Sequence, residues 1–407
     1  MRTIDLVLNT LTYIAAFILT YLSIYLVLIY LKNRETVLNY KGKRVWEPKV
    51  SIIVPAYNEE KLIGRCIESL LNLDYPKEKL EIIVVDDCST DRTYEVAKRY
   101  EPKGVRVVRT PANGGCAAKT KNYGLRFATG EVIGFLDSDS FVEPDTLRKM
   151  LPYFEEGVGA VTPAVRIWEP KNWIEKMQYI EYEVILFLRR VWMSVESVYV
   201  TPGPFSLFTR EAIESVGGFD ENSLTEDHEI ALNIQAKGYL IRSTIDATVF
   251  TVPPNTIISW IKQRTRWLRG GVYNRIKHKY LLNIFKYGEF GFVAITFDVA
   301  LLFPISLMLI GPPLRLIFND HWTDRLGLLS VFYSMDALTV LGVAMSIFSI
   351  GWFYHIWSYM KNYAPRYKVE WWIWILYLLA YSSLSGYVWL FVLWKEITRA
   401  SNTWDTR

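Results

Sequence analysis

Cysteine and histidine are scarce in this chain of 407 residues, which has three cysteines and four histidines. Cys66, Cys88 and Cys116 are too few and too far apart for a disulfide framework or for the paired spacing of a zinc site. The histidines are scattered, so a metal centre built on His and Cys is excluded. All three cysteines lie in the central block of the sequence, which is typical of a reducing, cytosolic compartment.

A strong excess of charge is also absent, because 46 Lys and Arg stand against 42 Asp and Glu for a net charge of +4. The basic residues cluster beside apolar segments and do not alternate with aromatic residues on a polar surface. This distribution predicts lipid headgroups or phosphates as neighbours and argues against nucleic acid as a partner. No Gly-x-Gly-x-x-Gly follows the first predicted strand, which excludes the dinucleotide-binding fingerprint.

Apolar residues, by contrast, make up 51% of the chain, and their longest runs lie at its two ends. Leu11–Leu31 is long enough to span roughly 30 Å of hydrocarbon. No small-residue cleavage site follows it, so residues 1–31 are predicted to be a transmembrane signal anchor. Residues 287–394 are predicted to hold three further transmembrane helices, at Phe290–Ile310, Gly327–Ile356 and Trp371–Trp394.

Basic residues beside these segments predict their orientation in a cell membrane. They follow the first span and separate the last two spans, at Lys32, Arg34, Lys41, Lys43, Arg44, Lys361, Arg366 and Lys368. Both stretches are therefore expected in the cytosol together with the central block, which places both termini and residues 312–325 outside. Asp298 and Asp336 fall inside predicted spans, where they either line a polar path across the membrane or meet water near a span end.

The central block alternates buried strands with helices. Strands are predicted at Lys49–Pro55, Glu81–Asp87, Val105–Val108 and Val132–Leu136, and helices begin near Glu59 and cover Leu62–Leu73. This βαβ pattern predicts an α/β domain with a mostly parallel sheet that binds ligands at the carboxyl ends of its strands.

Two later segments have the apolar spacing of amphipathic helices. Asn172–Trp192 carries its charged residues off the apolar stripe, which fits either a helix in the headgroup plane or a core helix with one wet face. Ile257–Ile284 has seven Lys and Arg between Lys262 and Lys279, and a predicted span follows it. We therefore expect amphipathic interface helices over residues 256–286.

Three acidic motifs lie where strands or turns end. Asp137-Ser-Asp139 closes an apolar strand and suits a hard divalent cation on phosphate oxygens, although solvated acidic turns are common. Asp86-Asp87 ends another strand, where a carboxylate can accept from a nucleobase N–H or cap a helix. Asp227, in Thr225-Glu-Asp227, is a candidate general base, or a first-turn carboxylate stabilised by the helix dipole.

A basic motif, Gln263-Arg-Thr-Arg-Trp267, precedes the second apolar block. Arg266 is permanently charged and fork-shaped, which suits a diphosphate. Gln263 and Trp267 share one helix face, where the indole offers a flat surface to a sugar ring. Taken alone, such a basic, aromatic helix is most often a membrane anchor.

The order Asp-Asp, Asp-x-Asp, Thr-Glu-Asp, Gln-x-x-Arg-Trp resembles the processive membrane β-glycosyltransferases of family 2, the group of the cellulose, chitin, hyaluronan and poly-N-acetylglucosamine synthases. The resemblance covers roughly residues 48–394. It implies a GT-A glycosyltransferase domain over residues 48–255, a UDP-sugar donor, a Mg²⁺ or Mn²⁺ ion and inversion at the anomeric carbon.

The same resemblance implies a role for each motif residue. Donor contacts fall on Tyr57, Glu59, Asp86, Asp87, Lys119, Asp137 and Arg266. The metal ion falls on Asp137 and Asp139, and the catalytic base is Asp227. Acceptor contacts fall on Gly203, Glu226, Gln263 and Trp267. The loop Thr201-Pro-Gly-Pro-Phe-Ser206 looks like the one beneath the acceptor sugar, and it favours N-acetylglucosamine over glucose.

Two departures from the family pattern matter. Many relatives have Asn-x-Gly-Lys where this chain has Asn113-Gly-Gly-Cys116, so the role of that lysine passes to Lys119 or Lys121, or is lost. Four spans are also few for a translocation channel unless interface helices or a second protomer complete it. A processive synthase that exports its polymer is therefore expected first. The alternatives are transfer of one sugar to a membrane lipid, and a non-catalytic membrane partner or transporter that kept the fold.

Overall fold

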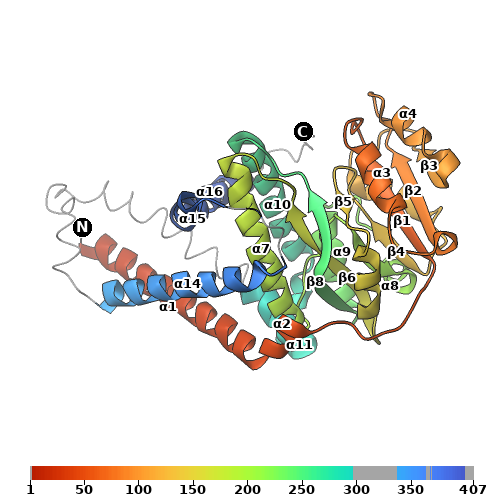
Figure 1. The fold of residues 1–407 in the computed structure, drawn as a ribbon. Helices are drawn as coiled ribbons and strands as arrows, with labels where there is room; N and C mark the ends of the chain where they lie inside the picture. Colours follow the sequence, from red (N-terminus) through yellow and green to blue (C-terminus); the bar gives the residue numbers. More distant parts are fainter. Residues whose placement is uncertain (1, 297–336, 364–366, 368, 399–407) are drawn as a thin grey trace.

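The computed structural model describes residues 2–296, 337–363, 367 and 369–398. Asp298, Asp336, Arg366, Lys368 and the parts of two predicted spans that fall within 297–336 lie outside the described residues. The described part consists of a sheet with helices on both faces and a group of long helices that project to one side of it (Figure 1).

One mixed sheet of eight strands forms the centre, in the order β3-β2-β1-β4-β7-β6-β8-β5. The four strands predicted from the sequence lie together and run parallel as β1 (Val50–Ala56), β2 (Leu80–Asp86), β3 (Val105–Arg109) and β4 (Val132–Phe135). The other half contains β5 (Phe141–Val142), β6 (Val158–Ile167), β7 (Ser206–Thr209) and β8 (Leu240–Thr251). There β6 and β8 pair in parallel, whereas β7 runs antiparallel to β4 and β6, and β5 antiparallel to β8. The sheet is therefore mixed, and the prediction of parallel strands holds fully for the first half and for the β6–β8 pair.

Both faces of the sheet are buried, because alternate residues of each strand enter different cores. Ile53 and Ile83 belong to one apolar cluster, whereas Ile52 and Ile82 belong to the other. The shorter covering helices are α3 (Ile63–Leu71), α4 (Thr93–Lys98), α5 (Ala117–Leu125), α6 (Thr146–Met150), α8 (Arg210–Ser215) and α9 (Glu226–Ala236).

The helix expected near Glu59 begins only at Ile63, because the intervening loop bonds to its neighbour instead. Asn58 adopts a left-handed φ of 55°. Its backbone N–H donates to the Ser89 hydroxyl at 3.0 Å, and the N–H of Glu59 donates to the Thr93 hydroxyl at 2.7 Å. The loops that follow β1 and β2 are thus tied together at the carboxyl edge of the sheet.

Helix α7 (Trp173–Met193) is a core helix, so its interpretation as a headgroup-plane helix is wrong. Its polar stripe finds partners within the protein: Glu183 accepts from Arg166 at 3.0 Å, and Arg190 donates to the carbonyl oxygens of Val37 and Ser243. One side of α7 packs on β6 and β8, and the other side meets the C-terminal apolar helices. Helical periodicity alone could not reveal that both sides are covered.

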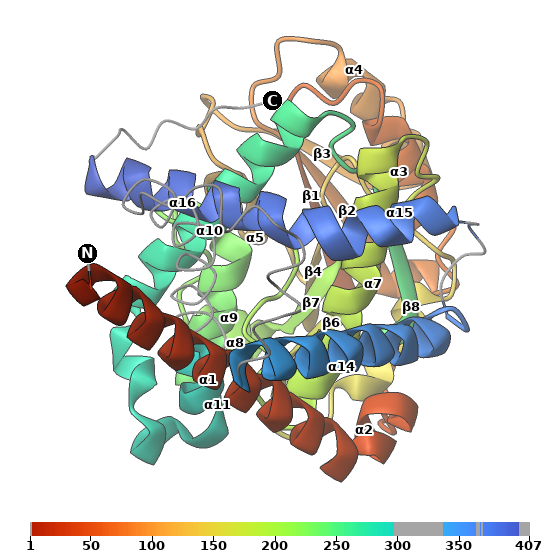
Figure 2. The same ribbon diagram turned by 90° about the vertical axis from the view of Figure 1, so that its left-hand side faces the viewer.

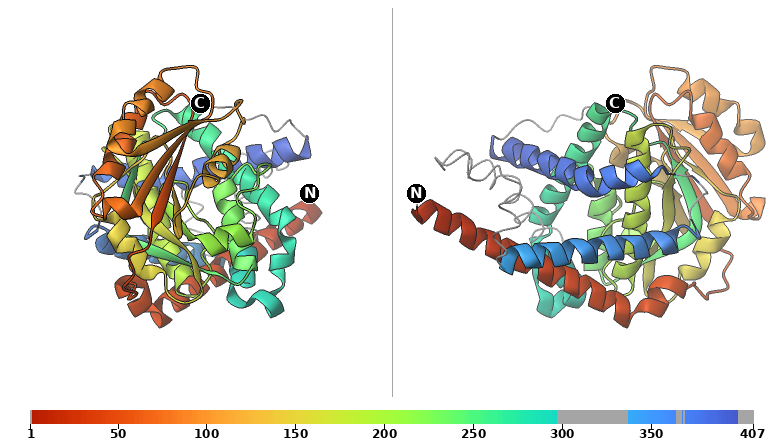
Figure 3. Two further views of the ribbon diagram at one scale, coloured as in Figure 1. Left: turned by 90° about the vertical axis from the view of Figure 1, so that its right-hand side faces the viewer. Right: turned by 60° about the vertical axis from the view of Figure 1, so that its left-hand side comes forward.

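The long apolar helices are α1 (Arg2–Lys32), α14 (Ala337–Met360), α15 (Trp371–Leu376) and α16 (Ser382–Ile397), with short α2 (Arg34–Asn39) after α1. Figures 2 and 3 show α1 and α14 side by side. Tyr30 joins them through a 2.6 Å hydrogen bond to His355 Nε2. Two helical segments of the described residues, Tyr13–Lys32 and Trp371–Glu396, are long and apolar enough to cross a membrane.

Helix α10 (Ile257–Lys277) runs between the domain and α16. A capping box of Thr256 and Ser259 starts it. Trp260 is fully buried and donates from Nε1 to the Tyr381 hydroxyl at 3.1 Å. Near its other end Arg269 pairs with Glu396 of α16 at 2.6 Å. A 3₁₀ turn (Lys279–Leu282) and α11 (Ile284–Thr296) follow.

Candidate active site

The Asp137-Ser-Asp139 motif leaves the end of β4, as predicted, and its carboxylates line a cavity of about 420 Å³. We call this cavity the catalytic cavity, after the role predicted for its residues. Burial raises the pKa of Asp137 to about 6, although Lys121 opposes this, and repulsion from Asp139 adds to it. Gly203 lies directly against this carboxylate: a Cβ placed there would be 2.5 Å from Asp137 Oδ2. The loop expected beneath the acceptor therefore contacts the motif expected to hold the metal.

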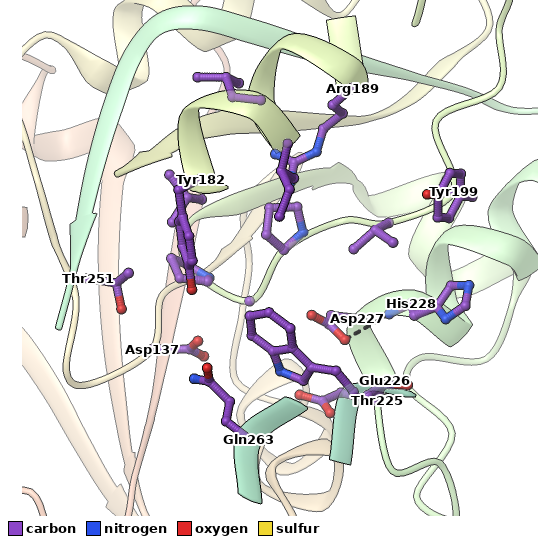
Figure 4. A pocket seen from close by; sticks show the side chains of 18 of the residues that line it. Asp137, Tyr182, Arg189, Tyr199, Thr225, Glu226, Asp227, His228, Thr251 and Gln263 are labelled. Atoms are coloured by element: carbon purple, nitrogen blue, oxygen red, sulfur yellow. Dashed lines mark hydrogen bonds between the residues drawn. The ribbon is translucent and has the colours of Figure 1, made fainter. Parts of the chain in front are cut away.

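The Thr225-Glu-Asp227 motif forms the start of α9, and Asp227 lines the same cavity. Its Oδ1 accepts from the backbone N–H of His228 at 2.9 Å, which orients the carboxylate (Figure 4). Its backbone carbonyl accepts from the Thr201 hydroxyl at 2.8 Å. Burial, and then repulsion from Glu226, raise the pKa of Asp227 above its ordinary range. A carboxylate of increased basicity facing a cavity can accept a proton from an acceptor hydroxyl.

Lys121, not Lys119, reaches this motif. Its ammonium forms a buried ion pair with Glu226 at 2.8 Å and lies 5.2 Å from the centre of the Phe219 ring. Burial alone would raise the pKa of Glu226, but Lys121 holds it below its ordinary value. Of the two lysines considered for the missing family lysine, Lys121 is therefore the one that meets the acidic cluster.

Lys119, predicted to contact the donor, lies in a second cavity of about 280 Å³ with Gly114, Gly115, Cys116, Glu221, Asn222, Leu224 and Tyr273. The backbone N–H of Gly114 in this wall donates to the Asp87 carboxylate at 3.1 Å. The second cavity thus adjoins the predicted nucleotide residues, and Lys119 is separate from the catalytic cavity.

Gln263, Arg266 and Trp267 of α10 line the catalytic cavity, as the motif predicts. Arg264, which sequence reasoning passed over, connects them. Its Nη1 donates to Gln263 Oε1 at 2.7 Å, and its guanidinium lies 4.1 Å from the centre of the Trp267 ring. It also pairs with Glu181 of α7. The buried arginine thereby contacts both Gln263 and Trp267 and holds them in place.

The predicted nucleotide residues lie apart from this cavity, at the ends of β1 and β2. Asp86 is fully buried; its Oδ2 accepts from Arg109 at 2.9 Å, whereas its Oδ1 has no hydrogen-bond partner among the described residues. Asp87 accepts from the Thr110 hydroxyl at 2.9 Å. Tyr57 is 37% exposed beside them, and Glu59 follows in the tied loop. A buried, half-satisfied carboxylate is a ready acceptor for an N–H donor.

Helix α7 supplies cavity residues that no motif indicated. Figure 4 shows Tyr182 and Arg189 reaching in from α7. Tyr199 and His228 lie at one end of the cavity, and Asp227 lies beside His228, across the cavity from Arg189. His228 follows Asp227 in the helix, so the two side chains point apart, but the cavity is wide enough for both residues to line it. Burial lowers the pKa of His228 to about 3, so its imidazole is neutral.

The pair Asp137 and Asp139 fits a divalent cation. Carboxylate oxygens are the ligands that Mg²⁺ and Mn²⁺ prefer, and the raised pKa of Asp137 reflects burial and mutual repulsion that a cation would relieve. Among the described residues, no group of three or more His, Cys, Asp or Glu could hold a metal by itself. Such a site therefore depends on further oxygens, such as those of a diphosphate.

The comparisons with known proteins agree with this geometry. Residues 51–217 match the family described as Glycosyl transferase family 2, so the chain contains a domain of that family and the resemblance is confirmed at the level of family 2. The probable glycosyltransferase YdaM of Bacillus subtilis is 33% identical over 256 residues, which cover 59% of this chain and 58% of that protein.

Relatives with different products match almost equally well. The poly-beta-1,6-N-acetyl-D-glucosamine synthase of Staphylococcus epidermidis is 30% identical over 253 residues, 61% of either chain. The beta-monoglucosyldiacylglycerol synthase of Synechocystis is 29% identical over 230 residues, 55% of this chain and 48% of that one. The chain thus spans about half to three-fifths of the length of these relatives.

Among solved structures, the mannosyltransferase PcManGT from Pyrobaculum calidifontis, in complex with GDP-Man and Mn²⁺, has a TM-score of 0.62 at 19% identity. The superposition covers 96% of this chain and 100% of that one. This likeness shows the fold, which is a GT-A domain with a mixed sheet.

Proposed function

We propose that this chain, whose residues 51–217 form a glycosyltransferase family 2 domain, is an inverting, metal-dependent enzyme that transfers sugar from a UDP-sugar at the cytosolic face of a membrane. One observation carries the proposal. Asp137, Asp139, Asp227, Arg266 and Trp267, which are scattered over 131 positions of sequence, line a single cavity. Chance placement of a metal pair, a base and a cation around one cavity is improbable without a shared reaction.

In the proposed reaction, Asp227 accepts the proton of an acceptor hydroxyl while that oxygen bonds to the anomeric carbon. The bond between this carbon and the diphosphate breaks, and the diphosphate leaves with the bonding electrons. Asp86 and Asp87 bind the nucleobase, and Arg266 faces the diphosphate. Trp267 offers its ring to the acceptor sugar.

Asp137 and Asp139 would hold Mg²⁺ or Mn²⁺, which supplies positive charge against the leaving diphosphate when bound. The chain's own share of this function is to keep both carboxylates at the end of β4. Gly203 contributes by allowing close approach of the acceptor loop.

The first candidate product is a polysaccharide, with N-acetylglucosamine as the expected unit, exported across the membrane by the predicted spans. The relatives named poly-beta-1,6-N-acetyl-D-glucosamine synthases support this candidate. A second candidate, transfer of one sugar to a lipid, is favoured by the apolar side chains of α7 in the cavity wall. The relatives named beta-monoglucosyldiacylglycerol synthases support the second candidate.

The test uses the purified full chain with Mg²⁺ or Mn²⁺, screened for nucleotide release against a panel of UDP-sugars, with GDP-mannose included because of the structural neighbour. The products are then sized. Release from a UDP-sugar with a ladder or high polymer supports the first candidate, and a single glycolipid supports the second. Absence of release from every donor contradicts the proposed function.

A further inference from the structure

Beyond Asp227, the catalytic cavity continues along α7 as a mainly apolar wall. One face of α7 and the loop after it supply this wall, with Ile185, Leu188, Trp192, Val198 and Val200. None of these positions belongs to the motifs that indicate glycosyl transfer. A sugar chain offers hydroxyl groups that such a wall leaves without hydrogen-bond partners. The wall instead suits a hydrocarbon chain.

A single cation, Arg189, interrupts this wall. Its Nη1 makes one long hydrogen bond, to the carbonyl oxygen of Pro163 at 3.4 Å. Among the described residues neither Arg189 nor its neighbour Arg190 forms an ion pair, but the guanidinium of Arg190 donates to the backbone carbonyl oxygens of several residues. Burial lowers the pKa of Arg189 to about 10, with Tyr199 and then Asp227 opposing the change. The guanidinium thus bears a desolvation cost for which the protein provides little compensation.

We propose that the acceptor is a lipid that carries a phosphate group, with Arg189 binding the phosphate and the apolar wall of α7 contacting the adjoining hydrocarbon chain. This inference rests on the proposed function, favours its second candidate, transfer to a lipid, and names the acceptor class of the same cavity. A phosphate matches the fork of a guanidinium and offsets its desolvation. Arg189 and Asp227 enter the cavity from opposite sides, so a bound phosphate leaves the acceptor's hydroxyl end facing the base (Figure 4).

A different role for Arg189 would be to stabilise the charge of Asp227 alone. The two roles have different kinetic signatures. An acceptor-binding arginine changes the KM for phosphate-bearing acceptors, whereas an arginine that acts on the base changes kcat with every acceptor and shifts the pH profile.

The experiment compares the wild-type full chain with Arg189→Gln, Arg189→Lys and the control Arg126→Gln, which removes an exposed arginine that does not line the cavity. Each is assayed with its active sugar donor in mixed micelles that contain phosphatidylglycerol, whose glycerol hydroxyls lie beyond its phosphate, or neutral diacylglycerol, which has a hydroxyl and no phosphate. Arg189→Gln should raise the KM for the phosphate lipid by about 10-fold to 100-fold, as expected for one charged hydrogen bond. Arg189→Lys should restore part of the affinity, and Arg126→Gln should behave as wild type.

Transfer to phosphatidylglycerol that Arg189→Gln weakens supports the proposal, and absence of transfer to phosphatidylglycerol by the wild type contradicts it. The proposal is overturned if neutral diacylglycerol serves equally well, or if Arg189→Gln lowers kcat equally with all acceptors. Nucleotide release that needs no phosphate lipid contradicts the proposed acceptor but not the proposed function. Failure to release nucleotide from any donor contradicts the proposed function as well.

Discussion

The side-chain amide of Asn274 donates to both the carbonyl and the hydroxyl oxygen of Thr225, with Nδ2 3.1 Å from each. Asn274 is fully buried and also accepts from the Ser223 hydroxyl at 3.0 Å. Gly270, one turn earlier in α10, lies so close that a Cβ there would be 2.3 Å from Thr225 Oγ1. This contact fixes α10, with its Gln-x-x-Arg-Trp motif, against the start of α9, where Asp227 lies.

Asn274→Ala should therefore lower both stability and turnover. It removes the hydrogen bond that the buried Thr225 hydroxyl accepts, and one bond each from the Thr225 carbonyl and the Ser223 hydroxyl, which keep their bonds to the N–H groups of Glu229 and Thr225. The expected cost is about 1–3 kcal/mol. Thermal unfolding and steady-state rates would measure the two effects. The control is Asn39→Ala, which removes an exposed amide that bonds only to Glu35. Wild-type stability in Asn274→Ala would contradict the role of Asn274 in fixing α10 against the start of α9.

Asp227→Asn should abolish sugar transfer and leave nucleotide binding largely intact, because the amide cannot accept the acceptor proton. The expected loss is about 10²-fold to 10⁴-fold in turnover. Nucleotide affinity by calorimetry and transfer by product formation separate the two properties. Unchanged transfer in this variant would remove the assignment of the base.

The pH dependence of transfer should reflect the same residue. Because burial and Glu226 raise the pKa of Asp227, the base becomes protonated at a higher pH than an ordinary aspartate. The rate should then fall on the acidic side at a pH clearly above about 4, the ordinary range of Asp. A pH–rate profile measures this, and an acidic limb at or below the ordinary range would speak against the raised pKa.

Gly203→Ala should weaken the metal dependence of the enzyme. The new Cβ would lie 2.5 Å from Asp137 Oδ2, so either the carboxylate or the acceptor loop must move. The concentration of Mn²⁺ needed for half-maximal rate should increase. Gly64→Ala is a suitable control, since that Cβ would meet only side-chain atoms of Tyr100 and Val96, away from the cavity. Equal Mn²⁺ titrations in both variants would exclude this role for Gly203.

Lys277→Met should destabilise the fold in a manner that depends on pH. Burial would raise the pKa of Glu229, but hydrogen bonds from His278 and Lys277 hold it below its ordinary value. This contribution to stability is present above the ordinary carboxyl range and is lost as pH falls through the lowered pKa. The difference in Tm between wild type and Lys277→Met should thus be large at pH 7 and shrink in strong acid. Lys286→Met, which changes an exposed lysine, serves as control. A difference in Tm between wild type and Lys277→Met that does not depend on pH would contradict the pairing of Lys277 with Glu229.

The parallel half of the sheet could be predicted because its strands are largely apolar runs, most of which end beside polar residues at one edge. Strands β6, β7 and β8 were not predicted. They pair across long stretches of chain, β7 has four residues, and β6 contains Pro163. Their burial comes from partners that local patterning does not reveal.

The residues of the candidate site were likewise predicted only in part. Motif residues on α9 and α10 and at the end of β4 meet at one cavity, because strand ends and helix starts face the same edge of the sheet. Arg189 and Arg264 were missed because a charged residue on an amphipathic helix is read as facing water. Arg189 instead faces the interior, since the sheet covers one side of α7 and the apolar helices cover the other. Arg264 of α10 is buried and paired with Glu181 of α7. The roles assigned to the motif residues stay predictions.

The bonds from Trp260 to Tyr381 and from Arg269 to Glu396 bracket the Gln263–Trp267 segment and attach it at both ends of α16. In the membrane-embedded enzyme that we propose, the tilt of α16 follows the hydrophobic thickness of the bilayer. A change in acyl-chain length therefore shifts Arg266 and Trp267 relative to Asp227. In that enzyme, the thickness of the bilayer would thus help to set the geometry of the reaction centre.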